Sequence, residues 1–442
     1  MRARIGRSKL LKVLGLGAAA ALLALAPTAA FAGKFKVLHS FCSEQSCHDG
    51  SVPTAPLVMD SAGNLYGTTS QGGIALQGTA FELKRTASGH YKFKKIMDFG
   101  HRPNNGGLII DTAGKLYGIY ENGEFFTLTF GLHKHKWQIG DLSVRCTQQN
   151  CGTSATGGLT YAGQSSGAPY DGSSPLYGAM ETGGNNNAGI VYQLTPNGNN
   201  GWTESVLYNF CAQGGDKCSD GQFPGGGVSL TAEGLFGVAI EGGGHNDGSI
   251  AGGSGVVYQL SSNNGSWTET VLHSFCSLKR CADGAFPVGQ LAVDSTGNFI
   301  GATEAGGGPC KRDPGGCGTV FQLTPAGADS VETVLYRFCS ERDCRDGYSP
   351  AAGVFLDPVG NLFGTTLAGG GDDIDRNGIG GGVAYQLSGN LFKVLHRFCS
   401  LPNCADGEYP ESSLISDGGG ALYGTVSLGG EFDGGSAYRL QP

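Results

Sequence analysis

Carboxylates that recur at one place in a repeated motif are the first candidates for chemistry. Each follows an apolar run of the LYG type, and the four are Glu121, Glu181, Glu241 and Glu304. If the repeats form a ring, these carboxylates lie on one rim, where a pair could serve as general acid and base on a glycosidic bond or bind a cation. The matching places in three other repeats hold Ser, Gln, Leu or Ala. A solvated acidic rim without chemistry is the simpler interpretation.

An oxygen-rich segment near the C-terminal end is a second candidate. Asp373, Asp375 and Asn377 stand at alternate positions before Gly378, as in the first half of a calcium-binding loop. The twelfth position, where such loops carry a bidentate acid, is Ala384. The segment is therefore either a calcium site or an ordinary polar turn. The sequence indicates no other cofactor.

The 14 cysteines all fall into close pairs, five with four intervening residues and two with six. We predict seven local disulfides, because an even number of locally paired cysteines is typical of exported proteins. The alternative, zinc thiolates, needs about four converging ligands, whereas these pairs belong to different repeats. The pairs are Cys42/Cys47, Cys146/Cys151, Cys211/Cys218, Cys276/Cys281, Cys310/Cys317, Cys339/Cys344 and Cys399/Cys404.

Three further groups of residues are expected to be structural. Tryptophans at the start of the predicted outermost strands should cover a sheet edge, and these are Trp137, Trp202 and Trp267. Histidines at one repeat position, before the closing aromatic, should serve packing, and these are His39, His273 and His396. The GQSSG segment at 163–167 matches G-x-S-x-G, but it lies in a hairpin insertion without the strand–turn–helix of a nucleophile elbow.

A motif of about sixty residues, repeated seven times, must position all of these side chains. Its LYG-type tyrosine falls at Tyr66, Tyr117, Tyr177, Phe236, Ile300, Phe363 and Tyr423. Each repeat holds four short runs rich in Val, Leu, Phe, Tyr and Thr, and the 79 glycines leave no window suited to a helix. Turns such as Asp60–Gly63 join antiparallel neighbours. We predict an all-β, seven-bladed β-propeller of four-stranded antiparallel blades; a parallel β-helix is the distant alternative.

The two ends of the propeller predict how the ring closes. The segment at 35–41, FKVLHSF, matches the last strand of other repeats, and the segment at 436–442, SAYRLQP, matches the third. Pairing them completes the seventh blade and removes an exposed edge. Residues 33–442 are thus expected to form a single domain and a monomer.

Residues 1–32 have a basic head, an apolar middle and the exit Ala30-Phe31-Ala32, which predicts a signal peptide cut after Ala32. An uncleaved membrane anchor is the alternative. The mature chain would carry 24 basic and 37 acidic residues, a net charge near −13. That charge disfavours nucleic acid and anionic membranes as partners. We expect a secreted or periplasmic protein with no membrane span after cleavage.

The composite motif VLYxF–C–DGxxP–LxxDxxGNLYGTT–GGG–TVFQL resembles the GloVer, or choice-of-anchor, tandem-repeat proteins of bacteria, over essentially all of residues 35–442. The resemblance implies an exported repeat protein with no established activity and supplies no catalytic residues. Nothing after Leu440 resembles an anchoring tail, so a free protein is expected rather than a surface-attached one.

Two functions compete. The first is an extracellular binding or scaffold propeller whose variable rim meets a glycan or protein. The second is a polysaccharide lyase or hydrolase that uses two of the rim glutamates. A lyase would need basic or aromatic side chains converging at the pore mouth. The rim offers only scattered examples, namely His101, His245, Lys311 and Arg312. We favour binding.

Overall fold

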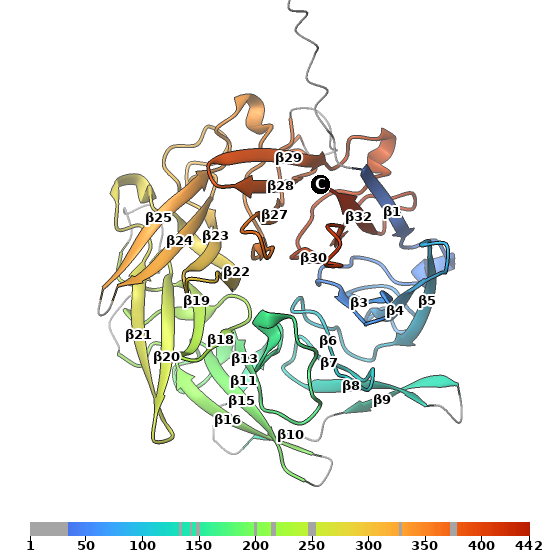
Figure 1. Ribbon diagram of the computed structural model, residues 1–442, viewed down its shortest axis with the longest axis horizontal. Coiled ribbons are helices and arrows are strands. Elements are labelled where there is room, and N and C mark those ends of the chain that lie inside the picture. Colours follow the sequence, from blue (N-terminus) through green and yellow to red (C-terminus); the bar gives the residue numbers. More distant parts are fainter. Residues whose placement is uncertain are drawn as a thin grey trace, which may run out of the picture. The chain divides into compact units, whose positions relative to one another are not determined.

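The computed structural model is a ring of small antiparallel sheets around a central axis (Figure 1). It describes residues 34–131, 135–141, 144–146, 151–198, 201–213, 218–245, 253–326, 329–371 and 378–442. Within these ranges the chain forms strands and short 3-10 turns and no α-helix. In the same ranges, no helix is long and apolar enough to cross a membrane. The predicted all-β, seven-bladed propeller is confirmed.

Each blade begins at its inner strand and ends at its outer strand. Blade 1 consists of β2 (Val58–Met59), β3 (Leu65–Thr69), β4 (Thr79–Arg85) and β5 (Tyr91–Asp98). Blade 2 consists of β6 (Ile109–Ile110), β7 (Leu116–Ile119), β8 (Phe125–Gly131) and β9 (Lys136–Asp141). Blade 3 consists of β12 (Thr160–Tyr161), β13 (Leu176–Met180), β15 (Ile190–Pro196) and β16 (Trp202–Asn209), with β10 (Val144–Cys146) added beside β16 and a small ladder of β11 (Gly152–Ser154) and β14 (Thr182–Gly183).

Blades 4 to 7 follow the same order. Blade 4 consists of β17 (Gln222–Pro224), β18 (Ser229–Thr231), β19 (Gly234–Glu241), β20 (Val256–Asn263) and β21 (Ser266–Ser274), and blade 5 of β22 (Ala285–Val293), β23 (Phe299–Ala305), β24 (Thr319–Ala326) and β25 (Asp329–Arg337). Blade 6 consists of β26 (Phe355–Leu356), β27 (Leu362–Thr366), β28 (Val383–Ser388) and β29 (Leu391–Arg397). Blade 7 consists of β30 (Ile415–Ser416), β31 (Leu422–Val426), β32 (Ser436–Gln441) and β1 (Lys34–Ser40).

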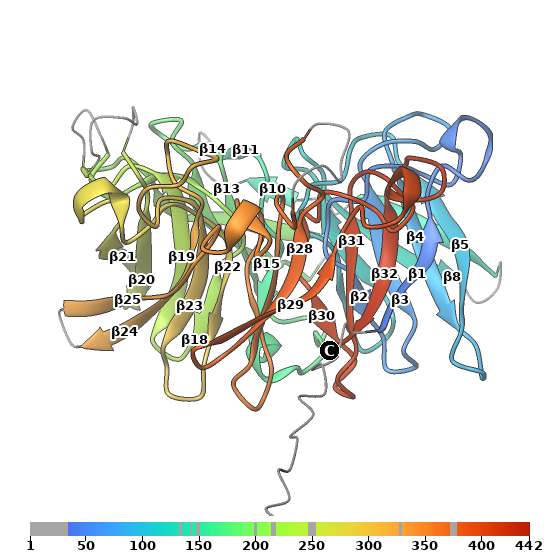
Figure 2. The same cartoon turned by 90° about the horizontal axis from the view of Figure 1, so that it is seen from above.

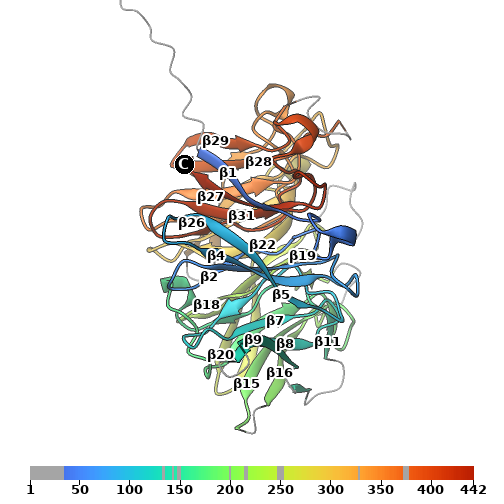
Figure 3. The ribbon, with the colours of Figure 1, turned by 90° about the vertical axis from the view of Figure 1, so that its right-hand side faces the viewer.

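The ring closes as the two ends predicted. Strand β1 pairs antiparallel with β32, from Lys34 opposite Gln441 to Ser40 opposite Ser436. In Figures 1 and 3 the first strand therefore lies among the last strands of the chain. The pairing supplies the outer strand of blade 7 and covers an edge that would otherwise be open to another chain.

The predicted hairpin turns also hold. In the first, Asp60 Oδ1 accepts hydrogen bonds from the backbone N–H groups of Ala62 and Asn64, both at 2.9 Å. Gly63 has a φ of 79°, a left-handed conformation that suits glycine. These turns lie on the face opposite the cysteine loops, which we call the lower face (Figure 2).

Five of the cysteine loops on the upper face are built around a buried aspartate of an Asp-Gly dipeptide. At the blade 6 to blade 7 loop, Asp406 accepts hydrogen bonds from the N–H and hydroxyl of Ser400, from the Leu401 N–H and from His396 Nε2 at 3.0 Å. Burial opposes ionisation of this carboxyl, but the bonds from His396, Ser400 and Leu401 outweigh it and keep its pKa below the ordinary value. Five such loop aspartates are 0% exposed: Asp49, Asp220, Asp283, Asp346 and Asp406.

The repeated histidines bind these loop aspartates, which confirms their structural role. His39 Nε2 lies 3.2 Å from Asp49 and His273 Nε2 lies 3.4 Å from Asp283. In two other blades a tyrosine hydroxyl takes the place of the imidazole and donates to the loop aspartate. These are Tyr208 on Asp220 at 2.8 Å and Tyr336 on Asp346 at 2.7 Å. The outer strand of one blade is thereby attached to the loop that starts the next.

The cysteine prediction is confirmed for the six pairs that the structure describes. Disulfides join Cys42–Cys47, Cys211–Cys218, Cys276–Cys281, Cys310–Cys317, Cys339–Cys344 and Cys399–Cys404. Cys151 is also disulfide-bonded, while residues 147–150 lie outside the described ranges. With the described sulfurs bound to each other, the zinc alternative has no thiolates to use.

Trp137 and Trp202 have the expected structural role, and each packs against the preceding blade. Trp202 is 5% exposed and its ring meets Tyr117 of the preceding blade edge-on, with centroids 6.4 Å apart. Trp137 meets Tyr66 of its preceding blade in the same way, at 6.0 Å. Such edge-on pairs add to the burial of apolar surface. The tryptophan and the LYG tyrosine are therefore two halves of one contact between blades.

Replacing Asp406 by Asn should lower the free energy of unfolding by about 2 kcal/mol, because an amide NH₂ then faces buried donors. Since the folded pKa of Asp406 is lowered, this carboxylate stabilises the protein above its unfolded pKa. The deficit of D406N should therefore persist above pH ~4 and shrink below it. Urea unfolding at several pH values measures this loss of stability.

The control is E44Q, which changes an exposed acid on the equivalent blade 1 loop. Equal stability of D406N and E44Q would contradict the account.

Candidate functional site

The inner strands enclose a central channel with a cavity of about 660 Å³. Every blade contributes to it, since the lining begins with Pro56 in blade 1 and ends with Ile415 in blade 7. Glycine, alanine and branched apolar side chains make up most of the wall. Its polar side chains are Asn105, Thr156, Tyr161, Gln164, Gln290, Glu411, Ser412 and Ser413.

Glycines bring the backbones of neighbouring inner strands into contact around this channel. A Cβ atom on Gly157 would lie 2.2 Å from the carbonyl carbon of Gly226, and one on Gly289 would lie 2.0 Å from the amide nitrogen of Gly353. Real Cβ atoms do not approach backbone so closely, so these positions require glycine. We call this set the glycine collar: Gly106, Gly157, Gly226, Gly289 and Gly353.

Short polar side chains join the inner strands of successive blades beside the collar. The bonds are 2.6 to 3.4 Å long and together bridge six of the seven blade interfaces. The donors and acceptors are Thr54 to Asn105, Asn104 to the Gly157 carbonyl, Thr160 to that of Val228, Ser229 to that of Leu291, Thr365 to that of Ser412, and Thr425 to that of Ala55.

The structure separates one of the four predicted glutamates from the other three. Glu121, Glu181 and Glu304 each stand five residues after the start of the LYG motif, whereas Glu241 stands six residues after it. Because side chains alternate along a strand, Glu241 points to the other side, where its Oε2 accepts a 3.0 Å bond from Gln222. The position of the other three is that of Ile240 and Leu367, whose side chains line the channel.

The three glutamates at this shared position differ in their surroundings. Glu304 accepts a 3.4 Å bond from Ser349 of the next blade, and burial raises its pKa. Glu121 lines a separate surface depression of about 360 Å³ beside His101 and Arg102. Glu181 is half-buried. None of the four lines the channel cavity itself, which leaves their catalytic role a hypothesis.

The carboxylate that does line the channel is Glu411, which the sequence analysis missed. It follows Pro410 at the upper end of blade 7 and accepts a 3.0 Å hydrogen bond from Ser427. Burial raises its pKa, and the Ser427 bond opposes that rise only in part. The signal was available in the DGxxP motif, because no other repeat has an acid directly after the proline.

The insertion of blade 3 lies at the lower end of the channel. Its Gln164 lines the cavity, and Gln290 of blade 5 reaches over blade 4 to donate to Thr160 at 3.0 Å. The GQSSG segment forms a 3-10 turn, Gln164–Ser166, between glycines in left-handed conformation. It is not the nucleophile elbow of a hydrolase, as expected.

The remaining rim candidates do not gather into a site. His245 and Lys311 lie on exposed loops of different blades. The proposed calcium ligands Asp373, Asp375 and Asn377 lie outside the described residues.

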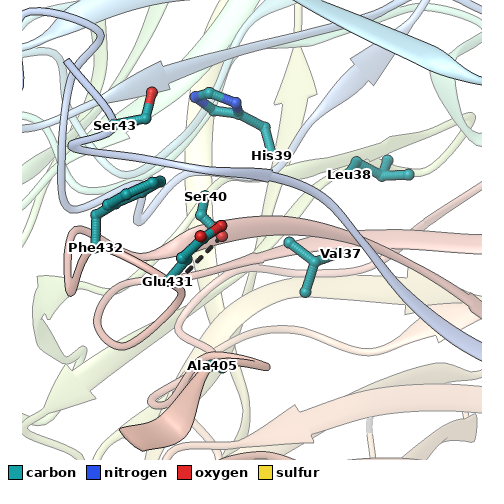
Figure 4. Close-up of a pocket in the computed structure, with 8 residues that line it drawn as sticks. All are labelled: Val37, Leu38, His39, Ser40, Ser43, Ala405, Glu431 and Phe432. Atoms are coloured by element: carbon teal, nitrogen blue, oxygen red, sulfur yellow. Dashed lines mark hydrogen bonds between the residues drawn. The ribbon is translucent and has the colours of Figure 1, made fainter.

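A second cavity of about 460 Å³ lies at the closure between β1 and the upper loops of blade 7 (Figure 4). Its wall includes His39, which is engaged with Asp49, and Ser40, whose hydroxyl accepts the Glu431 N–H at 3.3 Å. Phe432 borders it and is 44% exposed. Most polar groups here already serve the ring closure, so the central channel is the better candidate.

Comparison with known families shows which family the chain belongs to. The family model described as the Gloeobacter/Verrucomicrobia repeat matches residues 25–251 and 140–374. The chain belongs to this family. The resemblance drawn from the composite motif is thereby confirmed. No curated protein matches the sequence.

Solved structures that resemble this chain share its fold. The Cps50 (Swd1) β-propeller domain of Myceliophteria thermophila is 9% identical with a TM-score of 0.52, over 92% of this chain and 99% of that one. A puromycin hydrolase is 10% identical with a TM-score of 0.51, over 86% and 50%. A copper-containing fungal alcohol oxidase of the AA5 family is 13% identical with a TM-score of 0.50, over 93% and 76%. At such identities the likeness shows the propeller alone.

The collar makes a direct prediction. G157A should lower the free energy of unfolding by about 2 kcal/mol or more, because its methyl group meets the backbone of blade 4. Gly100 is the matched control, since a Cβ there meets nothing within 4 Å. Denaturant unfolding of both variants measures the difference, and equal midpoints would show that the inner strands separate at no cost.

Proposed function

We propose that this protein is an exported, non-catalytic binding propeller that holds the end of a neutral glycan in its central channel. The observation that carries the proposal is the lining of the cavity. Among the described residues, it combines amide and hydroxyl groups with a single carboxylate, Glu411, at its upper end. Its volume of about 660 Å³ is within the usual range for small-molecule sites.

The lining supports a sugar better than a charged metabolite. Hydroxyls and amides such as Ser413 and Gln164 pair with sugar hydroxyls, and a carboxylate forms the stronger, charge-assisted bonds. Tyr161 and Phe355 add aromatic surface in the lower half of the cavity. The carboxylate and the acidic mature chain together repel uronic and sulfated glycans.

The same lining argues against the polysaccharide-acting enzyme. Among the described residues that line the channel, the only ionisable ones are Glu411 and Tyr161. Tyr161 pairs with Leu176 at the start of β13, which puts it at the end of the channel away from Glu411. A hydrolase needs two carboxyl groups on one glycosidic bond, about 5–10 Å apart. One carboxylate suffices for binding.

Export is part of the proposal and rests on the predicted leader and on the disulfides. Local disulfides persist in oxidising compartments, which fits secretion or a periplasmic location. The calcium loop at Asp373, Asp375 and Asn377 stays a prediction, and a protein partner in place of a glycan is the other outcome of the test below.

The mature protein should bind neutral oligosaccharides and not acidic ones on a glycan array. E411Q should weaken binding by about tenfold or more, the loss expected when a charge-assisted hydrogen bond is removed. E233Q, an exposed acid in the lower turn of blade 4, is the control and should bind normally. Calorimetry with the best array hit gives the affinities, with and without EDTA to test the calcium loop.

Two results would contradict this function. Equal affinity of E411Q and wild type would remove the channel as the site. New reducing ends or unsaturated products, detected by mass spectrometry after incubation with polysaccharide, would establish the enzyme instead.

The predicted signal peptide, residues 1–32, specifies where the mature protein should begin. Expressed with residues 1–32 in a bacterial host, the protein should reach the periplasm or medium and begin at Gly33, as intact mass would show. A32R should block cleavage, because the exit site requires a small residue. Secretion of an uncut chain from the unaltered gene would contradict the assignment.

A further inference from the structure

The contact between the outer strands of successive blades, here called a seam, differs around the ring. One residue decides the difference: the residue six places before the closing aromatic of each outer strand. It is aromatic in three blades and glutamate in three others. These residues are Phe35, Phe93 and Phe392, and Glu204, Glu269 and Glu332.

The aromatic seams are closed by ring stacking. Phe392 stacks on Tyr336 with centroids 3.9 Å apart and planes 7° from parallel. Phe93 stacks on His39 at 3.7 Å in the same manner. In each case the stacked partner is the side chain that holds a loop aspartate, so the phenylalanine shields the buried carboxylate from water.

The seam between blades 3 and 4 has the same construction except for one residue. Tyr208 donates to Asp220 at 2.8 Å, just as Tyr336 donates to Asp346 at 2.7 Å. Strand β21 lies against β16 here (Figure 1), and Glu269 stands in the place of Phe392. Glu269 is 8% exposed and Asp220 is 0% exposed. Two carboxyl groups are thus buried in one seam.

The described groups that face this pair are polar but not cationic. Gln213 Nε2 approaches Glu269 Oε2 at 3.4 Å, and Tyr258 faces Glu269 from β20. Glu269 Oε1 and Asp220 Oδ1 are buried and form no hydrogen bond with the described residues. No described Lys, Arg or His forms an ion pair with either group. Asp216 and Lys217 belong to the same loop and lie outside the described ranges.

A proton is the simplest occupant of such a pair. Burial and the neighbouring Asp220 carboxylate raise the pKa of Glu269 to about 8. The next seam differs because His273 stands beside Glu332 and opposes the effect of burial on that carboxyl. The blade 3 to blade 4 seam therefore has two acids and, among the described residues, no base.

We propose that the seam between blades 3 and 4 is a proton-operated latch, closed while the Asp220–Glu269 pair holds a proton and loosened when the proton leaves. The described parts of the loop it controls, residues 211–213 and 218–224, lead into Gly225, which lines the channel. Thr156 of blade 3 donates to the Pro224 carbonyl at 3.2 Å, so the loop also touches the inner ring.

The direction of the pH effect follows from the sign of the shift. The folded pKa of Glu269 is raised, so its contribution to seam stability is complete at acidic pH and is lost as the pH rises toward 8. The titration of a single group changes the equilibrium constant between the closed and the loosened seam by at most tenfold per pH unit. The latch is therefore shut in acidic surroundings and open in alkaline ones.

Hydrogen exchange of the full mature protein tests the latch without any ligand. The reporter amides are those of Cys211 and Phe223, which donate to Gly221 and Ala188. Their protection factors, corrected for intrinsic exchange, should fall more than tenfold from pH 6 to pH 8. The Cys339 amide, bonded to Gly347 at the aromatic seam, is the internal control and should change less than twofold.

Two variants separate the latch from a merely weak loop. E269F copies the natural phenylalanine of the other seams, and E269Q keeps the shape without the charge; both should make the Cys211 and Phe223 protection independent of pH. K217A should leave the pH dependence in place. The proposal is overturned if E269Q still loses protection, if the wild type does not lose it, or if K217A abolishes the effect.

Discussion

Burial of an aspartate in five of the cysteine loops is the constraint on which the ring depends. A carboxylate at 0% exposure is tolerated only with several donors around it. Asp406 obtains them from Ser400, from the Leu401 N–H and from His396 on the preceding outer strand. The loop and the previous blade must therefore be in place together. The disulfide beside each aspartate holds the donors at short range.

The channel is a consequence of how closely the inner strands approach. Glycine at positions such as Gly157 and Gly226 lets backbones touch, and side chains such as Thr160 bridge to the next blade. These features use up most polar groups of the inner ring in holding it together. In the described part of the chain, what remains free to meet a ligand is a short set of side chains, among which Glu411 alone is acidic.

The residues that differ between the repeats are the candidates for function. Where most blades agree, as in the five loop aspartates and the hairpin turns, the residues support the ring. Where they differ, the change is local and chemically specific: an acid after Pro410, an insertion at the lower mouth of blade 3, and a glutamate in place of a stacked phenylalanine at Glu269. The first two shape the channel, and the third places a titratable group where three other blades have an aromatic side chain.

Much of the fold could be predicted from the sequence because its causes are local and repeated. Asp60 and Gly63 specify a hairpin wherever they recur, cysteines five residues apart are close enough to pair locally, and the matching ends of the chain predict the β1–β32 closure. The functional side chains were harder to place. The sequence put Glu241 with Glu121, although a shift of one residue turns it to the other side of the strand.

The sequence by itself thus determined the number of blades, the strand order and the disulfides, since each depends on neighbours within one repeat. Only the tertiary structure decided which carboxylate lines the channel and which is buried in a seam. Glu411 faces a channel whose wall comes from all seven blades, and Glu269 meets Tyr208 across the seam. Burial and charge at such positions are set by residues far apart along the chain, and no pattern within one repeat contains them.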